Sequence, residues 1–126
     1  AFKDELTGVY NRRGIFQLLE QSFFQAQRYG LNLELYYCDL NDFKKINDTY
    51  GHLAGDYILK NLAGIINSFV GSQGLCSRWG GEEFLIFVPY RDKNDTKLFA
   101  EELRKRVEEE KFVYDNQTIK LTIKQQ

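Results

Sequence analysis

Two acidic side chains follow a pair of glycines in the run Arg78-Trp79-Gly80-Gly81-Glu82-Glu83-Phe84. Carboxylates at the edge of a turn can bind a divalent cation or accept a proton. Glycine reaches the positive φ that tight hairpins use, and its lack of a Cβ lets another group approach the backbone. We therefore expect Gly80 and Gly81 to form a tight hairpin that presents Glu82 and Glu83. The alternative is a solvated surface hairpin without a ligand, since such turns often carry acids.

A second polar cluster extends from Asp39 to Asp56. Together the two clusters resemble the GGDEF family, the diguanylate cyclases, in its GGEEF form. The family patterns are matched at Asp4-x-Leu6-Thr7-Gly8-x-x-Asn11-Arg12-Arg13, at Asp39-x-x-x-Phe43-Lys44-x-x-Asn47-Asp48-x-x-Gly51-His52-x-x-Gly55-Asp56, and at Arg78-x-Gly80-Gly81-Glu82-Glu83-Phe84. The resemblance implies condensation of two GTP molecules into cyclic di-GMP, with release of pyrophosphate. It also implies a homodimer, because each chain presents only one nucleotide.

This chemistry needs a divalent cation, because a ribose 3′-hydroxyl is a poor nucleophile and the phosphates are densely anionic. Mg²⁺ prefers oxygen ligands and usually takes one or two protein carboxylates. If the strand that ends at Asp39 lies beside the glycine hairpin, Asp39 and Glu82 meet at one edge of the sheet. The resemblance implies that Asp39, the backbone carbonyl of Leu40 and Glu82 bind Mg²⁺ (or Mn²⁺), and that Glu83 adds a second metal contact. Either Glu82 or Glu83 is the general base, and the sequence does not choose.

Guanine recognition falls to Asn47 and Asp56 by the same resemblance. A carboxylate can accept hydrogen bonds from guanine N1–H and the N2 amine, a donor pair that adenine does not offer. Asp56 can equally cap the helix that follows it. Lys44 is expected to bind phosphate, with backbone amides near Asp42 and Phe43 as further donors. Otherwise Lys44 is a solvated surface lysine.

The single histidine, His52, lies in a glycine-rich stretch of the second cluster. Such a histidine is often structural, but in this motif it is expected to line the nucleotide pocket. The resemblance also implies that Gly80 and Gly81 let the ribose and phosphates lie against the backbone.

The composition limits the alternatives. The 126 residues are 43% hydrophobic and 15% aromatic, which indicates one globular domain of α/β or α+β class. The net charge of −1 without a basic block argues against nucleic-acid binding, including by a polymerase-like palm. No apolar run reaches membrane-spanning length and no signal peptide is visible, so we expect a cytoplasmic domain without direct membrane contact. Cys38 and Cys76 are expected to be buried thiols.

Periodicity predicts the order of the elements. We expect a helix over 13–29 that ends at Gly30, a strand over 33–38, a short turn or helix over 41–47 and a loop over 51–55. A helix over 56–70 and a hairpin of strands 75–79 and 84–88 follow. A loop over 92–95, a helix from Asp95 or Thr96 to Glu109 and a hairpin of strands 112–114 and 118–123 complete the chain. The β-α-β-β-α-β order is ferredoxin-like. It matches the palm-like α+β fold that the resemblance implies.

Three departures from the family pattern stand out. Asn41 replaces a frequent aspartate, and Gly71-Ser72-Gln73-Gly74 replaces the Arg-x-x-Asp of the family's product-inhibition site. The chain also ends at Gln126, before the family's last small-residue strand and a helix that grips the triphosphate. It contains no methionine, so we expect a piece of a longer protein with an upstream sensor domain. A catalytically silent module that binds GTP or serves as a scaffold is the alternative to an active cyclase.

Overall fold

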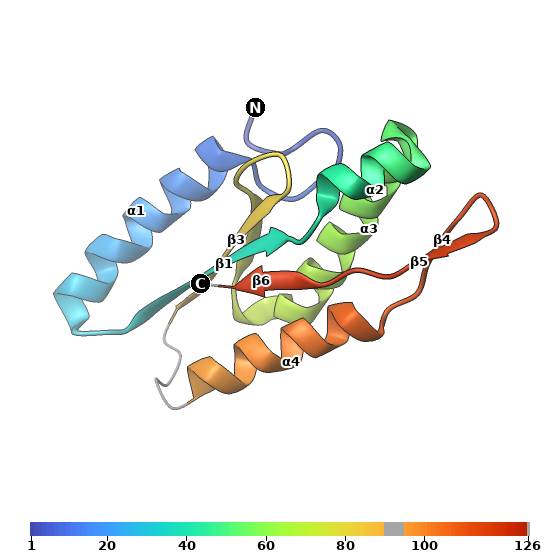
Figure 1. Cartoon of the computed structure of the whole chain (residues 1–126). Coiled ribbons are helices and arrows are strands. Elements are labelled where there is room, and N and C mark those ends of the chain that lie inside the picture. Colours follow the sequence, from blue (N-terminus) through green and yellow to red (C-terminus); the bar gives the residue numbers. More distant parts are fainter. Residues whose placement is uncertain (90–94, 126) are drawn as a thin grey trace.

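A computed structural model describes residues 1–89 and 95–125 of the chain (Figure 1). The helices are α1 (Arg12–Tyr29), α2 (Phe43–Tyr50), α3 (His52–Val70) and α4 (Thr96–Glu109), with a short 3-10 helix at Gly71–Gln73. The strands are β1 (Leu33–Leu40), β2 (Leu75–Arg78), β3 (Glu83–Pro89), β4 (Phe112–Tyr114), β5 (Gln117–Ile119) and β6 (Ile123–Gln125). The predicted loop over 92–95 lies, apart from its last residue, outside the described residues.

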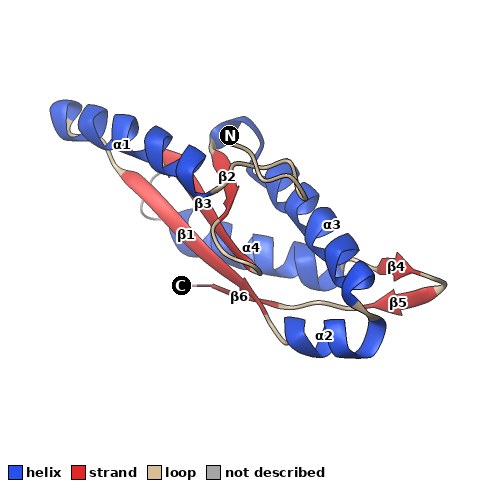
Figure 2. Ribbon diagram, turned by 90° about the horizontal axis from the view of Figure 1, so that it is seen from above, coloured by secondary structure: helices blue, strands red, loops and turns tan. Residues whose placement is uncertain are grey.

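Four strands form one sheet in the order β2-β3-β1-β6, and each neighbouring pair is antiparallel. Along the chain, β1 is followed by α3, β2, β3, α4 and β6. This is the β-α-β-β-α-β order and confirms the predicted α+β fold. Helix α2 and the β4–β5 hairpin are additions to it, and the hairpin extends away from the sheet (Figure 2).

The core lies on the face of the sheet that α3 and α4 cover. Alternate residues of β1, namely Tyr36, Cys38 and Leu40, are buried there. The Tyr36 ring lies 4.6 Å from the ring of Phe99 on α4. Helix α3 contributes Ile58, Leu62 and Ile66, which are fully buried, to the same cluster.

Helix α1 ends at Gly30 as predicted and begins at Arg12, one residue before the predicted start. The side chain of Asn11 accepts a hydrogen bond of 2.8 Å from the Gly14 N–H, and Gly30 ends the helix in the left-handed region with φ 66°. The helix has an apolar stripe at helical spacing that includes Ile15, Phe23 and Ala26, of which Ile15 and Ala26 are buried. Phe23 of the same stripe is 53% exposed, so α1 covers its side of the sheet only in part.

The prediction of a loop over 51–55 is wrong. Gly51, with φ 96°, separates α2 from α3, and α3 begins at His52. Gly55 therefore lies inside the helix, where it is buried. Asp56 is in the second turn of α3 and cannot be its N-cap.

The predicted strand over 118–123 is two strands in the structure. Residues 117–119 pair with β4 across a turn in which Asp115 and Asn116 have positive φ. Residues 123–125 instead pair with β1, where Leu40 lies opposite Ile123. Leu121 is buried between the two strands and joins the core.

Both cysteines are buried free thiols, as expected from the sequence. Burial raises the pKa of each thiol to about 12, so both remain protonated at neutral pH. Within residues 1–89 and 95–125, no helix combines the length and apolarity needed to cross a bilayer.

Candidate active site

The two polar clusters of the sequence meet at the end of β1. Asp39 is the second-last residue of this strand and lies opposite Glu83 in the β1–β3 register. The Leu40 N–H donates a hydrogen bond of 3.2 Å to the carbonyl oxygen of Glu82. The loop between β2 and β3 is thereby fixed against the end of β1, which is the predicted juxtaposition.

The carboxylate of Glu82 is affected by the charge of Asp39. Partial burial, and then the negative charge of Asp39, raise the pKa of Glu82 above its ordinary value. Oδ1 of Asp39 is buried and has no hydrogen-bond partner. Buried polar atoms normally have a partner, so an acidic oxygen without one beside a second carboxylate fits a cation.

The donor set fits Mg²⁺ better than a metal that needs a full protein cage. Among the described residues, no three Asp, Glu, His or Cys side chains gather around one point. Mg²⁺ keeps several waters and substrate oxygens, and it is usually held by one or two carboxylates. Asp39 and Glu82 meet that requirement.

Glu83 lies beside this pair but is held by different partners. The phenol of Tyr37 donates a hydrogen bond to Oε2 of Glu83. Oε1 lies so close to Gly80 that a Cβ at residue 80 would overlap it. The backbone N–H of Trp79 donates to the Glu83 carbonyl oxygen at 2.7 Å. The carboxylate of Glu83 therefore lies between a strand side chain and the glycine loop.

The sequence predicts a tight hairpin with positive φ at Gly80 and Gly81, but the structure does not show this turn. Neither Gly80 nor Gly81 has a positive φ, and the loop between Arg78 and Glu83 is longer than a two-residue hairpin turn. Gly80 instead makes room for the side chain of Glu83. A Cβ on Gly81 would meet no atom within 4 Å. The close approach expected for glycine is thus observed at Gly80, but the tight turn with positive φ is not.

The residues expected to bind guanine come together between α2 and α3. The side-chain oxygen of Asn47 lies over Gly55, where a Cβ would overlap it, and the ring of Phe43 is near the same glycine. Asp56 follows Gly55 directly in the chain, and its side chain is exposed. The amide of Asn47 on α2 and the carboxylate of Asp56 on α3 thus lie on either side of the close helix contact at Gly55.

His52 and Lys44 are less closely tied to these groups. His52 is the first residue of α3 and is exposed. The side chain of Lys44 is 93% exposed, and its ammonium lies 4.0 Å from Asp48, one helical turn away. The structure does not bring Lys44 into contact with the two acids.

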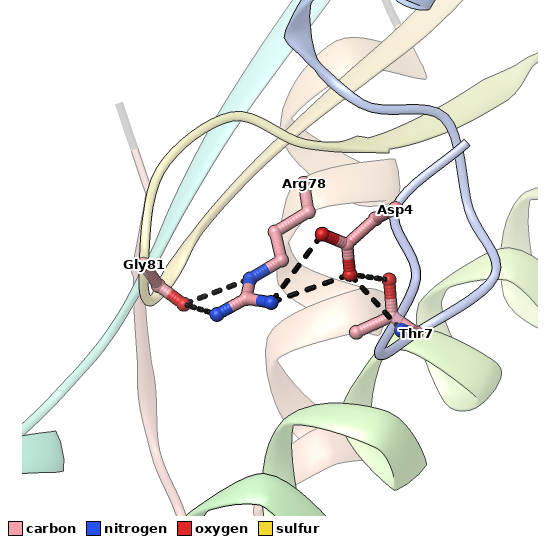
Figure 3. A network of polar contacts seen from close by, with 4 residues as sticks. All are labelled: Asp4, Thr7, Arg78 and Gly81. Carbon is pink, nitrogen blue, oxygen red and sulfur yellow. Dashed lines mark hydrogen bonds and ion pairs between the residues drawn. The ribbon is translucent and has the colours of Figure 1, made fainter. Parts of the chain in front are cut away.

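Arg78 connects the start of the chain to the glycine loop, as Figure 3 shows. Its Nε and Nη2 donate hydrogen bonds of 3.0 and 2.8 Å to the carbonyl oxygen of Gly81. Its Nη1 lies 3.3 Å from Oδ2 of Asp4, and the same oxygen accepts hydrogen bonds from the N–H and hydroxyl of Thr7. Asp4 thus orients Arg78, and Arg78 holds the loop that carries Glu82.

Arg12 fixes a second carbonyl of the same loop. Its Nε donates a hydrogen bond of 3.0 Å to Trp79, and its guanidinium lies 4.5 Å from the centroid of the Trp79 ring. The sequence motifs include Asp4, Arg12 and Arg78, but the sequence alone indicates no role for these three residues. These residues contact partners far away in the sequence; Asp4 and Arg78, for example, are 74 positions apart. A local sequence pattern therefore cannot predict the contacts.

Comparison with known proteins shows which family the chain belongs to. The family model described as "Diguanylate cyclase, GGDEF domain" matches residues 1–126. The chain belongs to the GGDEF family. Its resemblance at the three sequence motifs is therefore confirmed, and the enzyme class of its relatives is diguanylate cyclase.

Curated relatives of this GGDEF chain include the probable diguanylate cyclase DgcF of Escherichia coli K12, which is 41% identical over 121 residues. That match covers 95% of the chain and 37% of DgcF. The diguanylate cyclase DgcP of Pseudomonas aeruginosa is 34% identical over 122 residues, which are 97% of the chain and 18% of DgcP. The chain thus spans well under half the length of both relatives.

Solved structures of GGDEF domains share the fold. The GGDEF domain of DgcB from Caulobacter crescentus, solved with c-di-GMP, has a TM-score of 0.93 and 27% identity, over 99% of this chain and 75% of that one. The diguanylate cyclase SiaD of Pseudomonas aeruginosa, solved with its activator SiaC, has a TM-score of 0.93 and 33% identity, over 99% and 48%. The palm-like α+β fold is therefore that of the family.

Proposed function

We propose that the protein is an active diguanylate cyclase that condenses two GTP molecules into cyclic di-GMP and two pyrophosphates. In each half of the reaction, a ribose 3′-oxygen forms a bond to the α-phosphorus of the other GTP. The bond from that phosphorus to the pyrophosphate oxygen breaks, and the hydroxyl proton is released. The observation that carries the proposal is the convergence of Asp39 and Glu82, with one buried oxygen of Asp39 lacking any partner.

Asp39, the Leu40 carbonyl and Glu82 would hold Mg²⁺ or Mn²⁺ in this proposal. When bound, the cation lowers the pKa of the attacking hydroxyl and offsets phosphate charge. The two acids create the negative potential that attracts it. The raised pKa of Glu82 supports this role, because a cation removes the repulsion that Asp39 exerts on a second carboxylate.

The nucleotide base is assigned to a proposed pocket that Asn47 of α2 and Asp56 of α3 would border. Asn47 can donate to guanine O6, and Asp56 can accept from N1–H and the N2 amine. The backbone amide of Phe43 begins α2 and is free to donate to phosphate, as the first amides of any helix are. His52 is assigned to the border of the same proposed pocket. Gly81, where an added Cβ would meet no atom within 4 Å, leaves the loop backbone open to the ribose, whereas the space at Gly80 is taken by the Glu83 side chain.

Lys44 is proposed to bind a phosphate group of the nucleotide. Its side chain is exposed, so it must move to reach that phosphate. Because Lys44 is solvated, its side chain can change rotamer and bind an anion without losing a buried partner. Its contact with Asp48 is an exposed pair of the kind that contributes at most about 1 kcal/mol. Lys44 therefore pairs with Asp48 in the free protein and turns to phosphate when nucleotide binds.

Two chains are required, since one site holds one GTP and the reaction joins two. The active form is a homodimer in which the two nucleotides face each other. An upstream sensor domain in the longer protein and a cytoplasmic location complete the proposal. The matched region is 37% of DgcF and 18% of DgcP, so these relatives contain further segments of the kind that could form such a domain.

The direct test is product formation from GTP and Mg²⁺, assayed by chromatography. The wild-type protein is expected to form cyclic di-GMP, and Glu82→Gln is expected to lower the rate by about 100-fold or more, because it removes one of two cation ligands. Glu101→Gln, which removes the same charge from the exposed side of α4, is the control and should keep the wild-type rate. Absence of product from the wild-type protein at high concentration would contradict the proposal.

A catalytically silent GTP-binding module is the second candidate. The exposed position of Lys44, away from the acids, is the observation that favours it. Calorimetric binding of GTP without turnover, even after enforced dimerisation, would support this alternative.

A further inference from the structure

Within residues 1–89 and 95–125, the hydroxyl of Tyr37 is the one side-chain donor to Glu83. Tyr37 precedes Asp39 by two residues on β1, so the two side chains point to the same face of the sheet. In the β1–β3 register Tyr37 lies opposite Leu85, and Glu83 lies opposite Asp39. The phenol reaches diagonally across the strand pair to Oε2 of Glu83.

The other oxygen of the same carboxylate is confined by the glycine loop. Oε1 of Glu83 lies in the space that a side chain at Gly80 would fill. Oε2 of Glu83 is therefore held by a hydrogen bond, and Oε1 is held by its close packing against Gly80. A carboxylate held at both oxygens has lost most of its rotational freedom before any ligand arrives.

We infer that Tyr37 is a positioning residue, whose phenol holds the Glu83 carboxylate beside the Asp39–Glu82 pair in the orientation needed for the metal-dependent step. This inference rests on the proposed function. In this inference Tyr37 acts through Glu83, to which its hydroxyl donates. The hydrogen bond is charge-assisted, which makes it stronger than a bond between neutral groups. Without it, Glu83 can turn away from the strand face toward solvent.

The neighbouring Tyr36 provides a matched control. Its hydroxyl also donates to a glutamate, Glu34, at 2.7 Å. Tyr36 points to the opposite face of β1, where it packs against Phe99. Tyr36→Phe and Tyr37→Phe are thus the same substitution on adjacent residues, and each removes one phenol–carboxylate hydrogen bond. Only one of the two faces the candidate site.

The test measures both variants in the full chain by two independent readouts. The first is Mn²⁺ affinity in the presence of a GTP analogue with a methylene bridge between the α- and β-phosphates, followed by the paramagnetic resonance signal of free Mn²⁺. The second is steady-state formation of cyclic di-GMP. Tyr37→Phe is expected to weaken Mn²⁺ binding about fivefold and to lower kcat about tenfold, as loss of a hydrogen bond to a charged group predicts. KM for GTP should change by less than about twofold, because the base pocket is untouched.

A double variant tests whether Tyr37 acts through Glu83. In a Glu83→Gln background, Tyr37→Phe is expected to change either readout by less than about twofold, since the charged acceptor is already lost. Full effects of Tyr37→Phe in that background would overturn the inference. Equal behaviour of Tyr37→Phe and Tyr36→Phe would overturn it as well.

The two readouts separate this inference from the proposed function. If the wild-type protein forms no cyclic di-GMP, but Mn²⁺ affinity falls in Tyr37→Phe and not in Tyr36→Phe, the reaction is contradicted and the role of Tyr37 stands. If product forms and Tyr37→Phe matches the wild-type protein in rate and Mn²⁺ affinity, the role of Tyr37 is contradicted and the reaction stands. A wild-type protein that binds no Mn²⁺ would overturn both.

Discussion

The side-chain oxygen of Asn47 lies directly over the Cα of Gly55, so that α2 and α3 meet at a point where no side chain fits between them. The ring of Phe43 borders the same glycine, and a Cβ there would come within 3.2 Å of it. Gly55 is buried in the first turn of α3, directly before Asp56. The glycine thus sets the separation of the amide and carboxylate that are proposed to bind guanine.

Substitution of Gly55 by alanine is expected to displace the Asn47 amide. The side chain of Asn47 is flexible enough to move, so the fold should survive while the amide leaves its position. Loss of one nucleotide hydrogen bond raises KM for GTP by roughly 3- to 10-fold with little change in kcat. Steady-state kinetics of Gly55→Ala would check this, and an unchanged KM would contradict the pocket.

Gly64 of the same helix is the matched control. It is exposed, and an added Cβ would meet nothing within 4 Å. Gly64→Ala is therefore expected to raise the free energy of unfolding by up to about 1 kcal/mol through helix propensity alone. Its KM for GTP should equal that of the wild-type protein, which separates a general effect on α3 from displacement of Asn47.

The ion pair between Asp4 and Arg78 predicts a pH-dependent contribution to stability. Partial burial acts to raise the pKa of Asp4, but hydrogen bonds from Thr7 and the charge of Arg78 outweigh it, so the pKa lies below its ordinary value of 3.8. A carboxyl with a lowered pKa in the folded state stabilises that state above its ordinary pKa, and the contribution disappears as pH falls through the folded value. Asp4→Asn should cost about 1–2 kcal/mol of unfolding free energy at pH 7 and much less near pH 3.

Denaturant unfolding of the wild-type and Asp4→Asn proteins at both pH values measures this difference. Thr7→Val is a useful companion, because it removes one hydroxyl donor and leaves the charges in place. A difference between wild-type and Asp4→Asn proteins that is as large at pH 3 as at pH 7 would show that the carboxylate charge is unimportant.

The two buried thiols should be unreactive in the folded protein. The thiolate is the reactive form, and with a pKa of about 12 only on the order of one thiol in ten thousand is ionised at pH 8. Titration with an aromatic disulfide reagent should therefore show little reaction with the native protein. Both Cys38 and Cys76 should react promptly in guanidinium chloride. Rapid reaction of a thiol in the native protein would contradict the packing of β1 and β2.

The altered product-inhibition site gives a further expectation. The structure places residues 71–73 in the short 3-10 helix before β2, and the sequence there carries neither the arginine nor the aspartate of the family pattern. Without those charges, cyclic di-GMP has no ion-pair partner at this position. Added cyclic di-GMP should therefore leave the initial rate unchanged at concentrations well above that of the enzyme. Strong inhibition would show that another site binds the product.

The sequence predicts the fold well where local patterns and global structure agree. The end of α1 at Gly30, the apolar face of α3 and the strand before Asp39 each follow from residue types and spacing that packing then satisfies. Their order is enough for the sheet topology, because a β-α-β-β-α-β chain has few ways to bury one apolar face. The two acids of the site could likewise be paired in advance, since each follows or precedes a strand.

The errors arise where a residue serves a distant partner. Gly55 resembles a loop glycine in the sequence, but it allows Asn47 and Phe43 to approach α3. Residues 118–123 alternate like one strand, yet Ile123 pairs with Leu40, more than eighty positions earlier. The phenol of Tyr37 and the guanidinium of Arg78 also find partners that no local spacing indicates.

The most direct test of the account is whether Asp39 and Glu82 form one cation site. Mn²⁺ binding, followed by the paramagnetic resonance of free Mn²⁺ with the methylene-bridged GTP analogue present, should be lost to a similar degree in Asp39→Asn and Glu82→Gln. The double variant should lose little more than either single one, because the two acids act on the same ion. Glu101→Gln should bind as the wild-type protein does. Wild-type affinity in either single variant would contradict the shared site, and with it the proposed chemistry.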